Sequence, residues 1–180
     1  KPGFRGIPNA EKVWKVTKAQ IAAHLADLQD NGMIDEPISE IFSWPGRGNP
    51  FSLIYNGFEV PNESWVTAHF WDSDENGFYN PENGDYPIIA KRGNIFGLDM
   101  DQLVYSSFFN DTTGALSLGK SVHTNASLQA FTFDCNGIEF LENAAFIVYS
   151  FQFLGDSRMD STFFGIYADF NIGNPSDDYV

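Results

Sequence analysis

The chain is organised around residues 71–87, which read Trp71-Asp-Ser-Asp-Glu-Asn-Gly-Phe-Tyr-Asn-Pro-Glu-Asn-Gly-Asp-Tyr-Pro87. Side chains that end in oxygen recur at alternate positions, at Asp72, Asp74 and Asn76, and Gly77 follows at once. Ca²⁺ binds about six to eight oxygens, and alternate residues of a tight turn can all point at one ion. Gly77 permits such a turn because glycine adopts positive φ without steric cost. This spacing predicts a calcium-binding turn.

The second half of the turn differs from the helix-loop-helix calcium motif. That motif has a bidentate Glu at its twelfth position, which Asn83 occupies here. We expect Asp85 to replace it, with the carbonyl of Phe78 and the side chain of Asn80 or Asn83 as further ligands. Prolines inside and after the turn exclude an exiting helix, since proline breaks helix interiors. The alternative is a solvated acidic turn, because Asn, Asp, Gly and Pro are common in any tight loop.

A second group of oxygen-bearing residues follows the last predicted strand and includes Asp169, Asn171 and Asp178. An Asp-x-Asn-x-Gly turn followed by two aspartates would suit a second cation, or would complete the ligand set of the first. Ordinary turn residues at the end of a strand are the alternative.

Composition favours one domain with a large aromatic core, because 43% of the 180 residues are hydrophobic and 18 are Phe. The net charge is −14, and the excess of acidic side chains lies after residue 50. A nucleic-acid-binding surface is basic, so this charge excludes nucleic acid as a partner and disfavours adhesion to an anionic membrane. No apolar run is long enough to insert across a bilayer. Cys135 is the only cysteine, which excludes an internal disulfide.

One amphipathic helix is predicted over residues 18–30. Thr17 and Gln20 form a capping box, and an Asn-Gly step supplies the stop. The apolar stripe of the helix consists of Ile21, Leu25 and Leu28. His24 lies beside the stripe and is expected at the surface or its boundary rather than as a ligand. Trp44 is expected to pin the Pro/Gly-rich connection that follows the helix.

Four later segments have the aromatic and β-branched composition of strands, with turn residues between them: 103–109, 128–133, 144–154 and 162–170. A Gly-Asp-Ser turn joins the last two into a hairpin. Phe151 and Phe153 alternate with Gln152, as expected of a half-buried strand. Antiparallel strands with one helix predict a mostly β fold, an antiparallel β-sandwich with long irregular connections. We expect an N-terminal arm with one helix and a Pro/Gly-rich loop over 1–61, and the sandwich with its calcium-type turn over 62–180, as one structural unit.

The residues offer little for catalysis. The three histidines, His24, His69 and His123, have no metal-ligand spacing. Cys135 follows the acidic Asp134, which disfavours the thiolate. No nucleophile elbow, phosphate-binding loop or dinucleotide-binding fingerprint occurs. A non-catalytic protein is therefore expected.

A family resemblance is carried by four stretches: residues 14–21 (WKVTKAQI), 44–48 (WPGRG), 85–89 (DYPII) and the final run 149–180. Together with the turn, they resemble a module of large secreted surface proteins of Bacteroidetes, which carry C-terminal sorting domains for the type IX (Por) secretion system. The resemblance implies an extracellular, cell-surface location, where free calcium is plentiful and weak sites of about 10⁻⁴–10⁻³ M suffice. It also implies, as partners, other domains of the same polypeptide or components of the cell envelope and of secretion.

The family pattern continues past Val180 with a Gly-Cys step. The resemblance therefore implies that the chain is a fragment and that Cys135 pairs with a cysteine outside it. The expected function is that of a non-catalytic, calcium-binding structural or adhesive module. One alternative is a carbohydrate-binding module, which needs at least two exposed rings on one face from the set Trp44, Trp65, Trp71 and Tyr79. Another is an ancillary domain of a secreted hydrolase.

Overall fold

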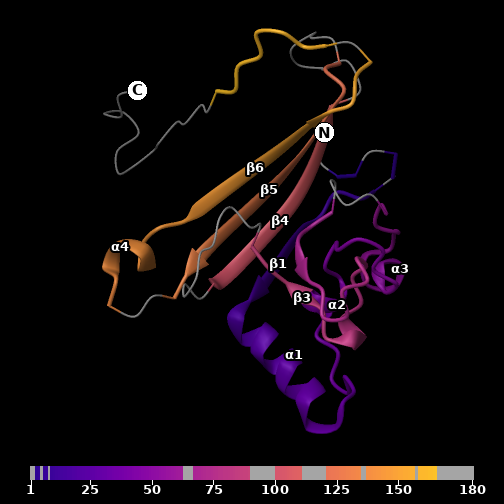
Figure 1. Ribbon diagram of the computed structural model, residues 1–180, viewed down its shortest axis with the longest axis vertical. Helices are drawn as coiled ribbons and strands as arrows, with labels where there is room; N and C mark the ends of the chain where they lie inside the picture. The colour runs from indigo at the N-terminus through magenta and orange to yellow at the C-terminus, as the bar shows by residue number, and fades with distance from the viewer. Residues whose placement is uncertain are drawn as a thin grey trace.

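The computed structural model describes residues 3–4, 6–7, 9–62, 67–89, 100–110, 121–134, 137–156 and 158–165. Within them the protein is rich in antiparallel sheet, as predicted. A four-stranded sheet has the strand order β1-β4-β5-β6 (Figure 1), and a two-stranded sheet pairs β2 with β3. The strand bounds are Val13–Thr17 (β1), Phe70–Trp71 (β2), Tyr86–Pro87 (β3), Met100–Asn110 (β4), Thr124–Phe133 (β5) and Phe146–Phe153 (β6).

The helix α1, Lys18–Asn31, is the longest helical element of the described chain, and its predicted ends are confirmed. The Thr17 hydroxyl accepts from the N–H of Gln20 at 3.3 Å, and the Gln20 side chain accepts from the N–H of Thr17 at 2.9 Å. Gly32 ends the helix in the left-handed conformation. The shorter helical elements are α2 (Ser39–Phe42), α3 (Ser52–Asn56), the 3₁₀ turn η1 (Pro81–Asn83) and α4 (Glu139–Glu142).

The register of the four-stranded sheet builds a row of apolar side chains across all its strands. Val16 lies opposite Leu103, Leu103 opposite Phe131, and Phe131 opposite Phe146. Val16 and Leu103 are completely buried, Phe131 is buried, and Phe146 packs against them. The core around this row is aromatic, as the composition predicted, and includes Phe4, Trp14, Trp44, Phe58, Tyr79 and Tyr105.

Strand β1 was not predicted from the sequence. It has only five residues and passes directly into α1, so its alternation of exposed and buried side chains is short and borders a helical pattern. Its pairing with β4 carries the N-terminal arm into the main sheet. Figure 1 shows α1, α2, α3 and β3 gathered beside β1, whereas β6 lies at the opposite edge of the sheet.

The connection after α1 is fixed by Trp44, as predicted. The Trp44 ring is fully buried, and its indole N–H donates to the carbonyl of His69 at 3.1 Å. The side-chain amide of Asn49 donates to the carbonyls of both Phe42 and Trp44 at 2.8 Å. The N–H of Tyr79 donates to the carbonyl of Arg47 at 2.7 Å, which ties this connection to the turn between β2 and β3.

The alternation predicted for β6 is present, but the expected buried side is wrong. Phe151 is 48% exposed and Phe153 is 38% exposed, whereas Gln152 is partly buried. The cause is the register, because Phe146 faces the core opposite Phe131 and every second residue from it shares that face. Residues 162–165 of the last predicted strand make no strand pairing, and 166–170 lie outside the described residues.

Candidate functional site

The predicted calcium turn connects β2 to β3 and is closed at its base by their pairing. Phe70 lies opposite Pro87, and Trp71 lies opposite Tyr86. The rings of Trp71 and Tyr86 stack at a centroid distance of 6.1 Å and an interplanar angle of 17°. The turn therefore leaves from and returns to a fixed pair of strands.

Two carboxylates of the turn converge on one backbone nitrogen. The N–H of Asn76 donates to Oδ1 of Asp72 and to Oδ1 of Asp74, each at 3.2 Å. The other oxygen of Asp72 accepts from the N–H of Gly77 at 2.7 Å. Gly77 has φ +78°, the left-handed conformation that was expected of a glycine at this position. These bonds bring the side chains of Asp72 and Asp74 together around the backbone of Asn76 and Gly77.

Asp74 also joins the two halves of the turn. Its Oδ2 atom accepts from the side-chain amides of Asn76 at 2.8 Å and Asn83 at 2.9 Å. Desolvation raises the pKa of Asp74, but hydrogen bonds led by the one from Asn83 outweigh it and hold that pKa below its ordinary value. Thus Asp72, Asp74, Asn76 and Asn83 form one hydrogen-bonded network.

Asp85 is placed differently from the other predicted ligands. Its side chain is fully buried, and its two oxygens accept from the N–H groups of Ser73 at 2.7 Å and Asn80 at 2.8 Å. Burial raises the pKa of Asp85, the two N–H donors oppose this, and the charges of Asp72 and Asp74 add to the rise. Asp85 therefore joins two separated parts of the turn, at Ser73 and Asn80, from the inside.

The two remaining predicted ligands of the turn have local structural contacts. Oδ1 of Asn80 accepts from the N–H of Glu82 at 3.1 Å and so caps η1. The N–H of Phe78 donates to Oδ1 of Asn76 at 2.7 Å. The Phe78 ring lies 4.6 Å from the guanidinium carbon of Arg47, an arrangement that favours a cation–π contact.

The turn packs against α1 through His24 and Leu28, and the expected surface position of His24 is wrong. His24 is fully buried, and neither ring nitrogen has a hydrogen-bond partner among the residues that the structure describes. Burial lowers the pKa of His24, while the nearby carbonyls of Asp85 and Pro81 and the charge of Asp27 oppose the shift. A periodic pattern places His24 beside the helix stripe but cannot show that a distant turn covers it.

A second acidic group was missed by sequence reasoning. Oxygens of Asp27, Asp30 and Asp35 lie within 4.8 Å of one another at the end of α1. Asp27 also accepts from the N–H of Glu36 at 3.0 Å, which holds the chain after the helix against its last turn. The spacing of Asp27 and Asp30 on one helix face was the available signal, whereas Asp35 joins them only because the chain folds back.

Some of the other predicted ligands and sugar-stacking residues lie outside the described part of the chain. Asp169, Asn171 and Asp178 lie outside the described residues, as do Trp65 and Cys135. Trp44 and Tyr79 are fully buried and are excluded as surface platforms for a sugar, whereas Trp71 is 47% exposed. Among the described members of the proposed sugar-stacking set, one ring remains at the surface.

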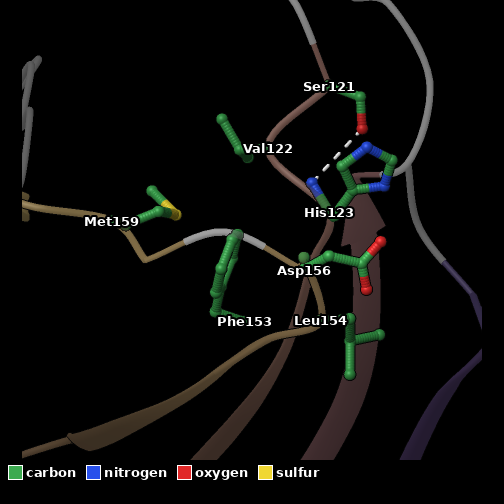
Figure 2. Close-up of a pocket in the computed structure, with 8 residues that line it drawn as sticks. Ser121, Val122, His123, Phe153, Leu154, Asp156 and Met159 are labelled. Carbon is green, nitrogen blue, oxygen red and sulfur yellow. Dashed lines mark hydrogen bonds between the residues drawn. The ribbon is translucent and has the colours of Figure 1, made fainter.

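A cavity of about 730 Å³ lies where β5 begins and β6 ends. Figure 2 shows His123 and Asp156 on one side of it, and Phe153 and Met159 on the other. The Ser121 hydroxyl accepts from the backbone N–H of His123 at 3.2 Å, so this bond holds the main chain and not the imidazole.

No protein-family model, curated protein or solved structure matches the chain. Within the described ranges, no helix combines the length and the apolar character that crossing a membrane requires.

Proposed function

We propose that the turn over residues 72–85 binds Ca²⁺ and that the protein is a non-catalytic, calcium-stabilised structural or adhesive module. The observation that carries this proposal is the convergence of Asp72 and Asp74 on the N–H of Asn76. A carboxylate oxygen keeps lone pairs beyond the one that an N–H group uses. The carboxylate oxygens of Asp72 and Asp74 can therefore coordinate a cation while they accept these backbone N–H groups.

The charges of the turn also favour a bound cation. Burial raises the pKa of Asp85, and the negative charges of Asp72 and Asp74 raise it further because they disfavour a third charge nearby. A raised folded-state pKa means that the contribution of Asp85 to stability is present below about pH 3.9 and is lost as the pH rises through the folded pKa. A divalent cation at the turn would offset that loss at neutral pH.

A structural role for the ion follows from what the turn contacts. The hydroxyl of Tyr79, which lies inside the turn, donates to the carbonyl of Ile41 at 2.8 Å within the core. Asp85 and Pro81 flank the buried His24 of α1. An ion that orders the turn would thus stabilise the packing of α1 and the core, by about 1.4 kcal/mol at a calcium concentration ten times the Kd.

The setting and the architecture of the module are part of the proposal. We propose a secreted, cell-surface protein of the type IX secretion class, on the strength of the sequence resemblance described above. Extracellular calcium saturates weak sites of this kind. We further propose that the exposed face of the four-stranded sheet is one inner face of a β-sandwich, because an apolar sheet face requires a second layer. Other domains of the same polypeptide or components of the cell envelope are the proposed partners.

Calcium titration of the full chain, followed by thermal unfolding, tests the metal proposal. We expect Tm to rise with calcium in the natural protein and not in Asp74→Asn, which removes one charge from the network. The matched control is Asp30→Asn, which removes one exposed charge from the acidic group on α1. Loss of the calcium effect in Asp30→Asn instead, or no rise at millimolar calcium in the natural protein, would refute the proposal for the turn.

A further inference from the structure

A second cavity, of about 370 Å³, lies along the free edge of β1. β1 is the outermost strand of the four-stranded sheet, and β4 is its one strand partner in the described part of the chain. The cavity is lined by four consecutive residues, 12–15, and by residues of α2 and α3, which lie beside β1 (Figure 1). Neighbouring residues of a strand point to opposite faces, so a cavity that all four line runs along the edge of the strand.

The backbone of β1 turns unpaired groups toward this edge. The carbonyl of Ser107 on β4 accepts from the N–H of Gly3 at 2.8 Å, on the side away from β5. Groups of alternate residues share one side of a strand, so the odd-numbered residues of β4 bond toward β1, opposite its even-numbered residues. The N–H and C=O groups of Val13 and Lys15 therefore point outward. The N–H of Thr17 agrees with this direction, since it donates to a side chain of α1 at 2.9 Å.

Lys12 places a positive charge at one end of this row of residues. Its ammonium donates to Oδ1 of Asn56 at 2.7 Å and to the carbonyl of Tyr55 at 3.3 Å. Both acceptors are uncharged, and no carboxylate of the described ranges forms an ion pair with Lys12. An ammonium has three N–H donors, so one remains for a further acceptor. Burial lowers the pKa of Lys12, as expected of a cation that has lost water without gaining a counter-ion.

The groups that hold the Lys12 ammonium are themselves fixed. Oδ1 of Asn56 also accepts from the indole N–H of the buried Trp14 at 3.0 Å. The side-chain amide of Asn56 donates to the carbonyl of Ser43 at 2.9 Å, so Asn56 joins β1, α3 and the end of α2. A ligand therefore meets a charge that is already in place, which reduces the entropy lost on binding.

The charge of the cavity is opposite to that of the whole protein. Its described lining includes the two lysines Lys12 and Lys15 and one acidic residue, Glu40, whose carboxylate accepts from the hydroxyl of Ser39 at 2.9 Å. The chain as a whole has a net charge of −14. A net positive cavity favours an anionic partner, whereas two copies of so acidic a chain repel each other.

We propose that this cavity binds an extended acidic segment of a partner protein, which adds to the free edge of β1 as a strand. The backbone of the segment pairs with the outward groups of Val13 and Lys15, and a Glu or Asp side chain accepts from the third donor of Lys12. A small anion would occupy Lys12 but would leave the outward carbonyls of β1 without donors. The row 12–15 matches about four residues, at about 3.3 Å per residue. The proposal is independent of the calcium turn.

Fluorescence anisotropy with the full chain tests the preference for an acidic segment. The probe is a fluorescein-labelled pentapeptide, Thr-Val-Glu-Val-Thr, and the comparison peptide has Gln in place of Glu. We expect saturable binding of the Glu peptide and about tenfold or more weaker binding of the Gln peptide, which lacks the charge that Lys12 bonds. Equal affinity for the two peptides, or no saturable binding at millimolar protein, would overturn the proposal.

Two lysine variants locate the charge that the peptide uses. Lys12→Gln removes the positive charge in the cavity. Its matched control is Lys18→Gln, because Lys18 is an exposed lysine at the start of α1 that pairs with Asp134 at 3.7 Å. We expect Lys12→Gln to weaken binding of the Glu peptide by about tenfold or more and Lys18→Gln to leave it unchanged. Equal losses in the two variants would show a general effect of charge and would contradict the site.

Val13→Pro tests the backbone pairing without a change of charge. Val13 is the first residue of β1, where proline is tolerated, and its outward N–H takes no part in the pairing with β4. We expect this variant to keep the Tm of the natural protein and to lose affinity for the Glu peptide. If Val13→Pro binds as the natural protein does and acetate displaces the peptide, the cavity takes a carboxylate alone and the added strand is refuted.

Hydrogen exchange of the natural protein gives a measurement that needs no variant. We expect the amide of Lys15 to gain protection when the Glu peptide is bound, because a strand at the free edge accepts from its outward N–H. The amide of Trp14, which pairs with β4, is the internal control and keeps its protection. A Lys15 amide that exchanges equally fast with and without the peptide would overturn the proposal.

Discussion

Asp85 shows how one buried carboxylate can order a polar turn from within. Each of its oxygens accepts a hydrogen bond from the backbone N–H of a different part of the turn, one from Ser73 near its start and one from Asn80 in its middle. Such charge-assisted bonds are stronger than those between neutral groups. The turn therefore depends on an acceptor at both positions, and not only on the negative charge.

We predict that Asp85→Asn destabilises the protein by about 1–3 kcal/mol, the cost of leaving a buried donor unsatisfied. The amide offers one acceptor oxygen and turns an N–H₂ group toward the second backbone N–H. The measurement is urea unfolding at pH 7, with Glu82→Gln as the control, since Glu82 is exposed on the same turn. Equal stability of the two variants would contradict this role of Asp85.

His24 makes the free energy of unfolding depend on pH, and the sign of this dependence follows from the burial of its ring. Because its folded-state pKa is lowered, the unfolded chain takes up a proton near pH 6.5 that the folded protein resists. The contribution of neutral His24 is complete above about pH 6.5 and is lost as the pH falls below it. The groups that face His24 are the carbonyls of Asp85 and Pro81 and the carboxylate of Asp27.

We predict that His24→Phe flattens the loss of stability between pH 7 and pH 5. The natural protein loses up to about 1.4 kcal/mol per pH unit through this one group. Phenylalanine does not titrate and keeps the edge contact with Phe42. Burial also lowers the pKa of His69, so only the difference between the two proteins reports on His24. Parallel curves of unfolding free energy against pH would contradict this prediction.

At the scale of elements, the contact between α1 and the turn rests on one glycine. Gly84 has φ +90°, and a Cβ atom there would lie 2.6 Å from Cδ2 of Leu28 on the helix. Gly137 has a similar φ of +89° but nothing within 4 Å of the added atom. A comparison of alanine substitutions at Gly84 and Gly137 therefore distinguishes the free-energy cost of the left-handed backbone from the cost of a steric clash with Leu28.

We predict that Gly84→Ala destabilises the protein more than Gly137→Ala. Both substitutions force alanine into the left-handed region, at about 1–3 kcal/mol. Only Gly84→Ala also brings a methyl group against the Leu28 side chain on α1, which must then move. Leu28→Ala is expected to restore part of the stability of Gly84→Ala, which a double-mutant cycle in urea measures. Equal costs for the two alanines would show that the helix does not press on the turn.

The helices and strands that could be predicted from the sequence are those that depend on residues close together in the chain. The capping box of Thr17 and Gln20 and the glycine stop define α1, and composition alone located most of β4, β5 and β6. β1 was missed because its five residues join the sheet through a distant partner. The exposed side of β6 could not be known without its register, which depends on the strand beside it.

The same distinction applies to the candidate site. Alternating oxygens and Gly77 predicted the first half of the turn, because these residues are neighbours in sequence. Asp85 is an internal acceptor because two N–H groups from elsewhere in the turn point at it. Asp35 approaches Asp27 only through the fold of the chain after α1. Non-local contacts of these kinds leave no signature in one sequence.

At the scale of the whole molecule, the N-terminal arm and the main sheet share one core. β1 pairs with β4 over all five of its residues, and Trp14 contacts Phe4, Phe58 and Tyr105. A division of the chain after residue 61 would cut through this core. Neither part buries its apolar surface without the other.

We predict that the arm and the sheet unfold together in one transition. Far-UV circular dichroism and tryptophan fluorescence are expected to give the same urea midpoint, as two-state unfolding requires. Trp14 and Trp44 report on the shared core because both are buried. Trp71→Phe is the control, since it removes an exposed tryptophan outside the core. Two separate midpoints would mean that the arm is a unit of its own.

The stacked pair of Trp71 and Tyr86 has an optical consequence. Trp71 directly precedes Asp72 and is the described tryptophan that reaches solvent, whereas Trp14 and Trp44 are enclosed. Its emission is therefore red-shifted from theirs and is sensitive to quenchers dissolved in water. Any tightening of the turn at Asp72 moves this ring relative to Tyr86, so the protein carries an intrinsic fluorophore at the mouth of its own candidate ion site.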